Sequence, residues 1–182
     1  MEFPSVGGPS PDIPVSASGE AVRLYRKHMS FVEPSEPQAL AWVAASGLEG
    51  VEKLTARLFL QPAEKQPKNV EAFERNAWTR ELGYEGGAPQ GRFAAPARYT
   101  VRLHFAEALG AEPGERVFDV FIQGEKKLDD FDVAAAAGGA GRAIVREFAG
   151  VAVLDDLSVE FRPRRGSRPP IVSGLEIQKE EL

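Results

Sequence analysis

The stretch YTVRLHFA, residues 99–106, decides the fold class of this chain. Successive side chains of a β-strand point to opposite faces, so a strand with one buried face alternates apolar and polar residues. One set of alternating positions here is apolar throughout: Tyr99, Val101, Leu103 and Phe105. The stretch therefore predicts a strand that turns these four side chains toward a hydrophobic core.

The same period of two appears on both sides of this strand. Residues 54–60 and 157–161 alternate in the same way, and residues 117–122 are apolar on both faces except at Asp119, which indicates a central strand. Short strands at a spacing of roughly 8–12 residues, joined by glycine- and proline-rich turns such as residues 112–115, are typical of sandwiches. The sequence predicts an all-β fold, an antiparallel β-sandwich or jelly roll.

Other segments are less regular. The glycines of residues 133–141, VAAAAGGAG, predict a compact loop rather than a helix, and residues 143–148 and 151–154 read as two short strands. Residues 171–177 read as the closing strand. Residues 21–45 are compatible with a short helix through residues 38–45 or with a strand around Trp42, which is expected in the core in either case.

The length of 182 residues suits one domain. Residues 1–20 contain four prolines and three glycines, which predicts a linker or a disordered arm, and residues 21–182 are then the domain. The chain shows no signal peptide after Met1 and no apolar run near the roughly 20 residues that cross a bilayer.

Composition and motifs exclude several function classes. A net charge of −5 argues against nucleic acid or an anionic membrane as the main partner. The absence of cysteine rules out disulfides and thiolate ligands, and with only two histidines neither a metal nor another cofactor is expected. The sequence has no nucleophile elbow and no phosphate loop, so we expect no enzyme.

Several blocks of the chain, in order, resemble the malectin-like domain family. They are YTVRLHFAE (99–107), GERVFDV (114–120), LDDFDV (128–133), AGG (137–139), VREF (145–148) and SGLEI (173–177). The resemblance implies a β-sandwich and a bacterial member of the family, an accessory domain of a larger extracellular or periplasmic protein. It also implies carbohydrate binding, because the family's best-known member is a lectin for a glucose disaccharide.

The sugar-site positions of that lectin that align with this chain carry other residues here. An adjacent Tyr-Phe pair follows the Phe-Ala-Glu motif in the lectin, and Leu109 and Gly110 stand at those positions here. An acidic ligand residue of the lectin falls on Arg168. Two functions therefore stay open: a non-catalytic glycan-binding domain, or a protein-interaction or structural sandwich that has lost the sugar site.

Seven residues are candidates for a role in binding or in a polar network. Aromatic side chains in loops stack on sugars, and polar groups fix their hydroxyls, so the carbohydrate-binding candidates are Trp78, Tyr84, His104 and Arg168. His104 is expected on the solvent-exposed face of its strand. Charged groups among apolar strands predict a paired, partly buried network, which would consist of Glu107, Arg116 and Asp119.

Overall fold

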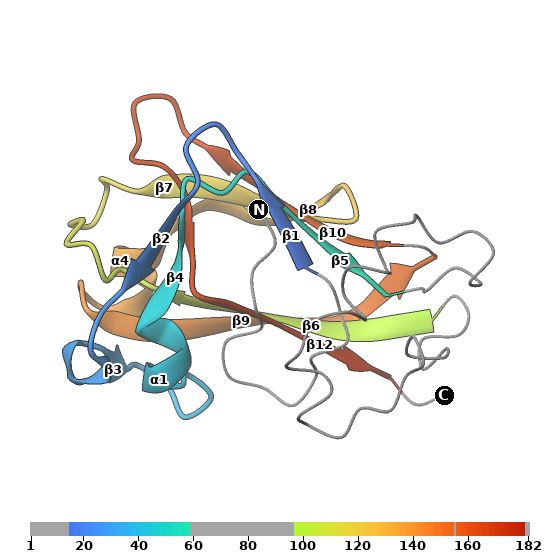
Figure 1. The fold of residues 1–182 in the computed structure, drawn as a ribbon, viewed down its shortest axis with the longest axis horizontal. Coiled ribbons are helices and arrows are strands. Elements are labelled where there is room, and N and C mark those ends of the chain that lie inside the picture. Colours follow the sequence, from blue (N-terminus) through green and yellow to red (C-terminus); the bar gives the residue numbers. More distant parts are fainter. Residues whose placement is uncertain (1–14, 59–96, 155, 181–182) are drawn as a thin grey trace, which may run out of the picture.

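The computed structural model describes residues 15–58, 97–154 and 156–180. Two large sheets lie in separate layers (Figure 1). The first has the order β1 (Val15–Ser18), β5 (Lys53–Arg57), β10 (Asp156–Pro163), β7 (Val117–Ile122) and β8 (Glu125–Asp132). The second has the order β12 (Gly174–Lys179), β6 (Ala97–Ala106), β9 (Arg142–Val153) and β3 (Glu33–Pro34).

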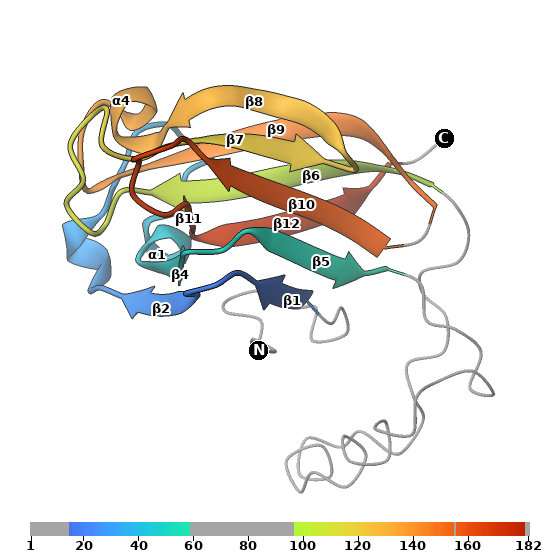
Figure 2. The same ribbon diagram turned by 90° about the horizontal axis from the view of Figure 1, so that it is seen from above.

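A third, smaller sheet lies at one end of the two layers. Its order is β11 (Ile171–Val172), β4 (Ser46–Glu49) and β2 (Arg23–Arg26). Three short helices complete the described fold: η1 (Met29–Phe31), α1 (Ala41–Ala44) and α4 (Val133–Ala137). All strand pairs are antiparallel except the short pair of β3 with β9. The predicted antiparallel β-sandwich is confirmed, and both views show its layered form (Figures 1 and 2).

The core lies between the two large sheets, because the alternating apolar side chains of their strands point into this space. Tyr99, Val101, Leu103 and Phe105 of β6 are all buried in one cluster with residues of β5, β7 and β10. Four phenylalanines from four strands contact one another there: Phe105, Phe118, Phe131 and Phe161. Burial of such side chains supplies most of the driving force for folding.

Residues 133–137 form helix α4, so the predicted loop is wrong at this point. The Asp132 side chain accepts a hydrogen bond from the Ala135 N–H and caps the first turn, and alanines favour the helix. Gly138 then adopts a left-handed conformation, φ 79°, that ends it. The glycines thus stop the helix rather than prevent it.

Three other boundaries differ from the sequence expectation. The strands predicted at residues 143–148 and 151–154 are one strand, β9, which pairs with β6 through a bulge. The predicted closing strand divides into β11 and β12, which join different sheets. β1 pairs with β5 and so brings residues 15–18 of the expected arm into the sandwich; residues 1–14 lie outside the described residues.

The segment between β2 and β4, residues 27–45, which the sequence left open, lies over the outer face of the second sheet. Its small apolar residues pack against the outward-facing side chains of β6 and β9; the cluster is Val32, Ala39, Ala44, Ala45, Ala106, Ala143 and Val145. We call residues 28–45 the cap. Trp42, expected in the core, is 46% exposed on its outer side.

Candidate functional site

The loop that follows β6 crosses the end of the sandwich, and Glu107 holds it in place. This carboxylate is buried, and its Oε1 accepts hydrogen bonds from the N–H groups of Leu109 at 3.0 Å and Ala111 at 3.2 Å. The Glu107 carbonyl accepts a third from the Gly141 N–H at 2.8 Å. One residue therefore fixes the loop and ties it to the turn before β9.

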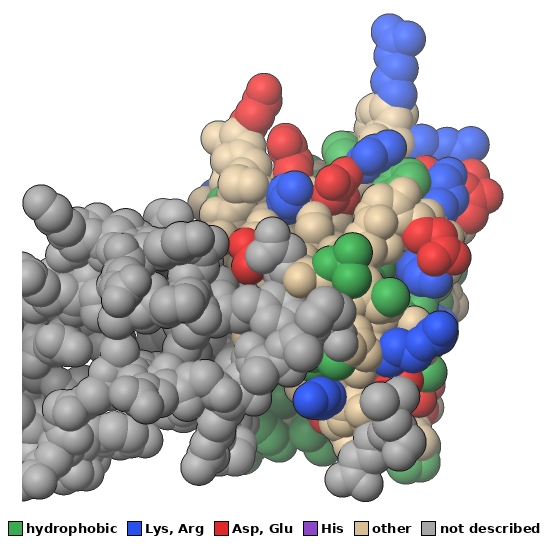
Figure 3. Space-filling model, turned by 90° about the vertical axis from the view of Figure 1, so that its right-hand side faces the viewer, with side chains coloured by type: hydrophobic (Ala, Val, Ile, Leu, Met, Phe, Trp, Pro, Cys, Tyr) green, Lys and Arg blue, Asp and Glu red, His purple; other side chains and the backbone are tan. Residues whose placement is uncertain are grey.

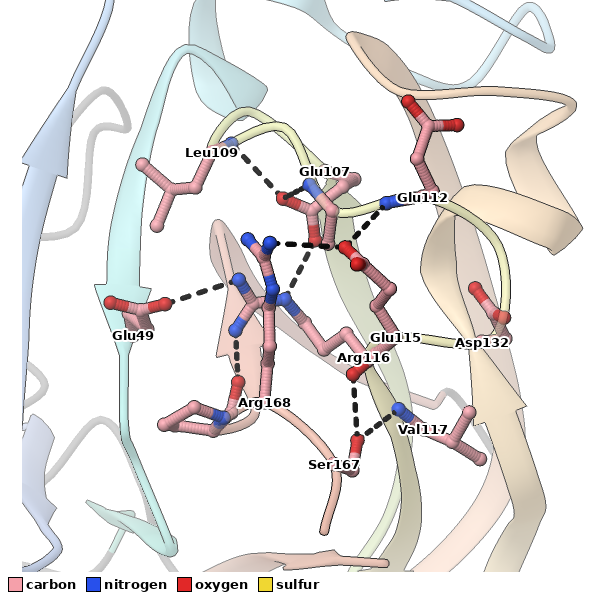
Figure 4. Close-up of polar contacts among 12 residues, drawn as sticks. Glu49, Glu107, Leu109, Glu112, Glu115, Arg116, Val117, Asp132, Ser167 and Arg168 are labelled. Atoms are coloured by element: carbon pink, nitrogen blue, oxygen red, sulfur yellow. Dashed lines mark hydrogen bonds and ion pairs between the residues drawn. The ribbon is translucent and has the colours of Figure 1, made fainter.

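Arg116, at the start of β7, lies beneath that loop and joins it to two other parts of the chain (Figure 4). Its Nε donates to Glu107 Oε2 at 2.6 Å, and its Nη2 donates to Glu49 Oε1 at 3.1 Å on β4. Its Nη1 donates to the Pro169 carbonyl. A buried guanidinium needs such partners, because an unpaired charge away from water is strongly destabilising.

A second, more exposed group of contacts lies beside this network. Arg168 forms an ion pair of 3.0 Å with Glu115, and the Ser167 hydroxyl accepts from the Val117 N–H at 2.6 Å (Figure 4). Glu115 also accepts from the Glu112 N–H at 3.0 Å. Arg168, a predicted sugar ligand, is thus engaged in holding the basic loop of residues 162–170 against the 112–117 turn.

The same end of the molecule is hollowed. A depression of about 380 Å³ opens above the buried network. Its lining comes from the residue before the cap, from the cap itself, from the loop after β6 and from the turn before β9: Lys27, Phe31, Glu107, Ala108, Gly110, Ala140 and Gly141. The Phe31 side chain is 70% exposed, so the hollow combines an open aromatic side chain, an ammonium group and backbone polar groups.

The structure brings together two of the three residues predicted as a network. Glu107 and Arg116 are paired and buried. Asp119 lies apart on the outer face of β7, where it pairs with Lys126 at 2.6 Å and accepts from the Asp130 N–H at 2.9 Å. These hydrogen bonds, chiefly that of Lys126, lower the pKa of Asp119. Asp119 points outward because it lies an odd number of residues from the inward-facing Phe118.

His104 is buried, and its expected exposure is wrong. The cap covers its face of β6: a Cβ on Gly174, the residue paired with His104, would stand 2.8 Å from Val43 Cγ1. Its Nε2 is 3.6 Å from Glu176, and its Nδ1 has no hydrogen-bond partner among the described residues. His104 therefore lies under the cap and not in the hollow.

This burial has a consequence for stability. Desolvation lowers the pKa of His104 below its usual 6.5. The unfolded chain therefore binds a proton at a higher pH than the folded chain. The stability associated with neutral, buried His104 is complete above the pKa of the unfolded chain, and it is lost as the pH falls toward the pKa of the folded chain. We expect urea unfolding to show a declining free energy from roughly pH 7 to pH 5. His104→Gln should flatten this decline, and parallel profiles would contradict the assignment.

The two remaining sugar-binding candidates are not among the described residues, and three residues of the site were not predicted. Trp78 and Tyr84 lie outside the described residues. Glu49, Lys27 and Phe31 were missed, and no local signal identifies them, because each reaches the site through contacts with distant parts of the chain. Among the described residues, no group of three His, Asp or Glu side chains is placed to hold a metal ion.

Two further properties bear on the kind of protein. No helix in the described ranges has the length and apolar character of a membrane span. The model of the family described as "Malectin domain" matches residues 59–164, which is more than half of the chain.

Curated relatives match a smaller part. A probable leucine-rich repeat receptor-like serine/threonine-protein kinase of Arabidopsis thaliana is 31% identical over 94 residues, 43% of this chain and 9% of the relative. Receptor-like protein 4 of the same plant is 35% identical over 82 residues, 43% of this chain and 13% of the relative. The chain thus spans about a tenth of the length of these proteins. The plant relatives do not support the expected bacterial origin.

Solved structures share the fold over most of the chain. The ANX2 ectodomain from Arabidopsis thaliana has a TM-score of 0.60 at 16% identity, covering 92% of this chain and 42% of its own. A beta-glucuronidase of Bacteroides uniformis has a TM-score of 0.56 at 12% identity, covering 91% of this chain and 14% of the enzyme. The malectin domain is a binding module and not a catalytic one. The family match covers the loop after β6 with Glu107 and Arg116, but not their partners Glu49 and Pro169. This chain belongs to the malectin domain family.

Proposed function

We propose that this chain is an extracellular glycan-binding domain of a longer protein and that it binds saccharides in the hollow above Glu107. Family membership supports carbohydrate binding, and the plant relatives, in which such a domain occupies about a tenth of the length, support a module within a larger receptor-like protein. The ectodomain and extracellular-domain neighbours support an extracellular location.

The observation that carries this proposal is the position of Phe31. Sugars are held by aromatic faces against their C–H groups and by hydrogen bonds to their hydroxyls. Leu109 and Gly110 stand where the family's lectin has its aromatic pair, and Phe31, from the start of the cap, supplies an exposed ring in the same hollow. Lys27 and the backbone of Ala108, Gly110 and Ala140 lie around it and can bond hydroxyl groups.

Calorimetry with neutral gluco-oligosaccharides of two to six units tests the proposal. We expect saturable binding, and we expect Phe31→Ala to weaken it about tenfold, which corresponds to about 1.4 kcal/mol of lost stacking. Leu154→Ala, which removes an exposed side chain outside the hollow, is the matched control and should bind as the unchanged protein does. An absence of saccharide binding, or equal binding by the Phe31 variant, would remove the hollow from consideration.

A further inference from the structure

The cap has its large and small side chains in an unusual arrangement. Small residues, Ala39, Ala44 and Ala45, make its inner contacts with the sheet. Its large apolar side chains face solvent: Met29 is 57% exposed, Phe31 70%, Leu40 40% and Trp42 46%. Stability alone would favour the reverse, because burying large side chains removes more apolar surface from water.

These exposed side chains are concentrated in one place. Of the six large exposed hydrophobics in the described part of the chain, four lie on η1 and around α1, and these two helices contact each other. Isolated exposed hydrophobics need no explanation, whereas a contiguous group on a soluble domain marks an interaction site. The described residues on the face drawn in Figure 3 carry acidic and basic side chains beside small groups of hydrophobic side chains.

The cap is held firmly to the sheet beneath it. The Glu33 N–H donates to the Gly141 carbonyl at 2.8 Å, and the Ser35 N–H donates to the Ala143 carbonyl at 2.9 Å. Glu36 Oε1 accepts from the Val145 N–H at 2.6 Å. The exposed side chains are therefore presented on a fixed backbone, which lowers the entropy lost when a partner binds.

The charge beside the cap is opposite to that of the whole molecule. Residues 21–45 contain three basic residues and two acidic residues, while the chain carries −5. Arg23 is paired with Glu49, but Arg26 and Lys27 are exposed and form no ion pair with any residue that the structure describes. Two unneutralised cations next to an apolar surface complement a partner that is acidic around apolar side chains.

We propose that the outer side of the cap binds an acidic protein segment, whose apolar side chains cover Met29, Leu40 and Trp42 while its carboxylates pair with Arg26 and Lys27. This is the protein-interaction function that the sequence left open, placed on a surface that adjoins the glycan hollow and shares Lys27 with it. Trp, Met and Arg are enriched in such interfaces. A bilayer is a poorer fit, because the carboxylate-bearing Glu33 of the cap is also exposed.

Selection from a random library of displayed dodecapeptides tests this proposal. We expect the selected peptides to be enriched in Asp and Glu around Trp, Phe or Leu. Synthetic copies should bind Trp42→Ser and Met29→Ser at least tenfold more weakly than the unchanged protein, measured by fluorescence polarisation. Arg26→Glu should give a similar loss that diminishes in high salt. Leu154→Ser removes an exposed side chain far from the cap in sequence and should have no effect.

Other outcomes would overturn the proposal. They are peptides without acidic enrichment, equal binding by the Trp42 variant, sedimentation with phosphatidylserine vesicles in place of peptide binding, and a dimer that Trp42→Ser dissociates. Thermal unfolding checks that each variant is folded. None of these variants changes a residue that lines the hollow, so saccharide binding should persist in all of them. Loss of the glycan proposal would leave the peptide result standing, and the reverse also holds.

Discussion

Replacing Arg116 with methionine is expected to lower the free energy of unfolding by about 3–5 kcal/mol. The substitution leaves the fully buried carboxylate of Glu107 without its cation and removes the contact with Glu49. The penalty arises mainly because the remaining charge is buried and unpaired, and less because a favourable contact is lost. Urea unfolding followed by circular dichroism measures the effect.

Arg23→Met is the matched control, because Arg23 pairs with the same Glu49 at 2.6 Å but its side chain is 71% exposed. A solvent-exposed pair contributes about 0–1 kcal/mol, so this variant should be nearly as stable as the unchanged protein. Equal losses in the two variants, or a loss below about 1 kcal/mol for Arg116→Met, would show that burial does not govern this network.

Phe118→Ala is expected to have an effect of similar size, about 3–5 kcal/mol. Phe118 is fully buried, and its ring lies 6.2 Å from that of Phe105, 5.8 Å from Phe131 and 6.1 Å from Phe161. Its removal opens a cavity at the centre of the sandwich and breaks three aromatic contacts. The loss is measured from the denaturant concentration at the midpoint of unfolding, compared between the two proteins at an unchanged m-value.

Phe121→Ala tests the face of the same strand that points outward. Phe121 is half-buried, and the Arg162 guanidinium lies 4.0 Å from the ring centroid. The loss should be about 1 kcal/mol, from a partly exposed cation–π contact. A loss as large as that of Phe118→Ala would mean that the two faces of β7 are equally buried, contrary to the alternation on which the fold rests.

The strands were predictable because their signal is local. Residues 99–106 and 157–161 alternate with a period of two, and residues 117–122 are apolar on both faces except at Asp119. Each of these segments forms a strand whose apolar side chains join the core. Each turn and each family block is also a short run of consecutive residues, so that it can be identified from neighbouring residues alone. Helix α4 was missed because its formation depends on one capping residue, Asp132, at the end of the preceding strand.

The candidate site was predictable only in part. Charges set among apolar strands indicated that Glu107 and Arg116 would be paired, since a buried charge requires a partner. The same reasoning predicted that Asp119 would join this network. That prediction is wrong, because the Asp119 side chain points outward from β7. Glu49 and Phe31 reach the site from β4 and η1. No local sequence pattern predicts that these two segments lie close to the loop after β6.

The amino-acid sequence alone determined several strands, among them β6, β7 and β10, the apolar face of β6 and, through its ordered blocks, the family; strands β1 to β4 were not predicted from it. Only the tertiary structure decided that the cap covers the outer face of β6, which buries His104 and leaves Trp42 facing solvent. The physical reason is the range of the interactions. Strand periodicity follows from neighbouring residues, whereas the position of the cap depends on contacts between segments distant in the chain, including the bonds of Ser35 and Glu36 to β9.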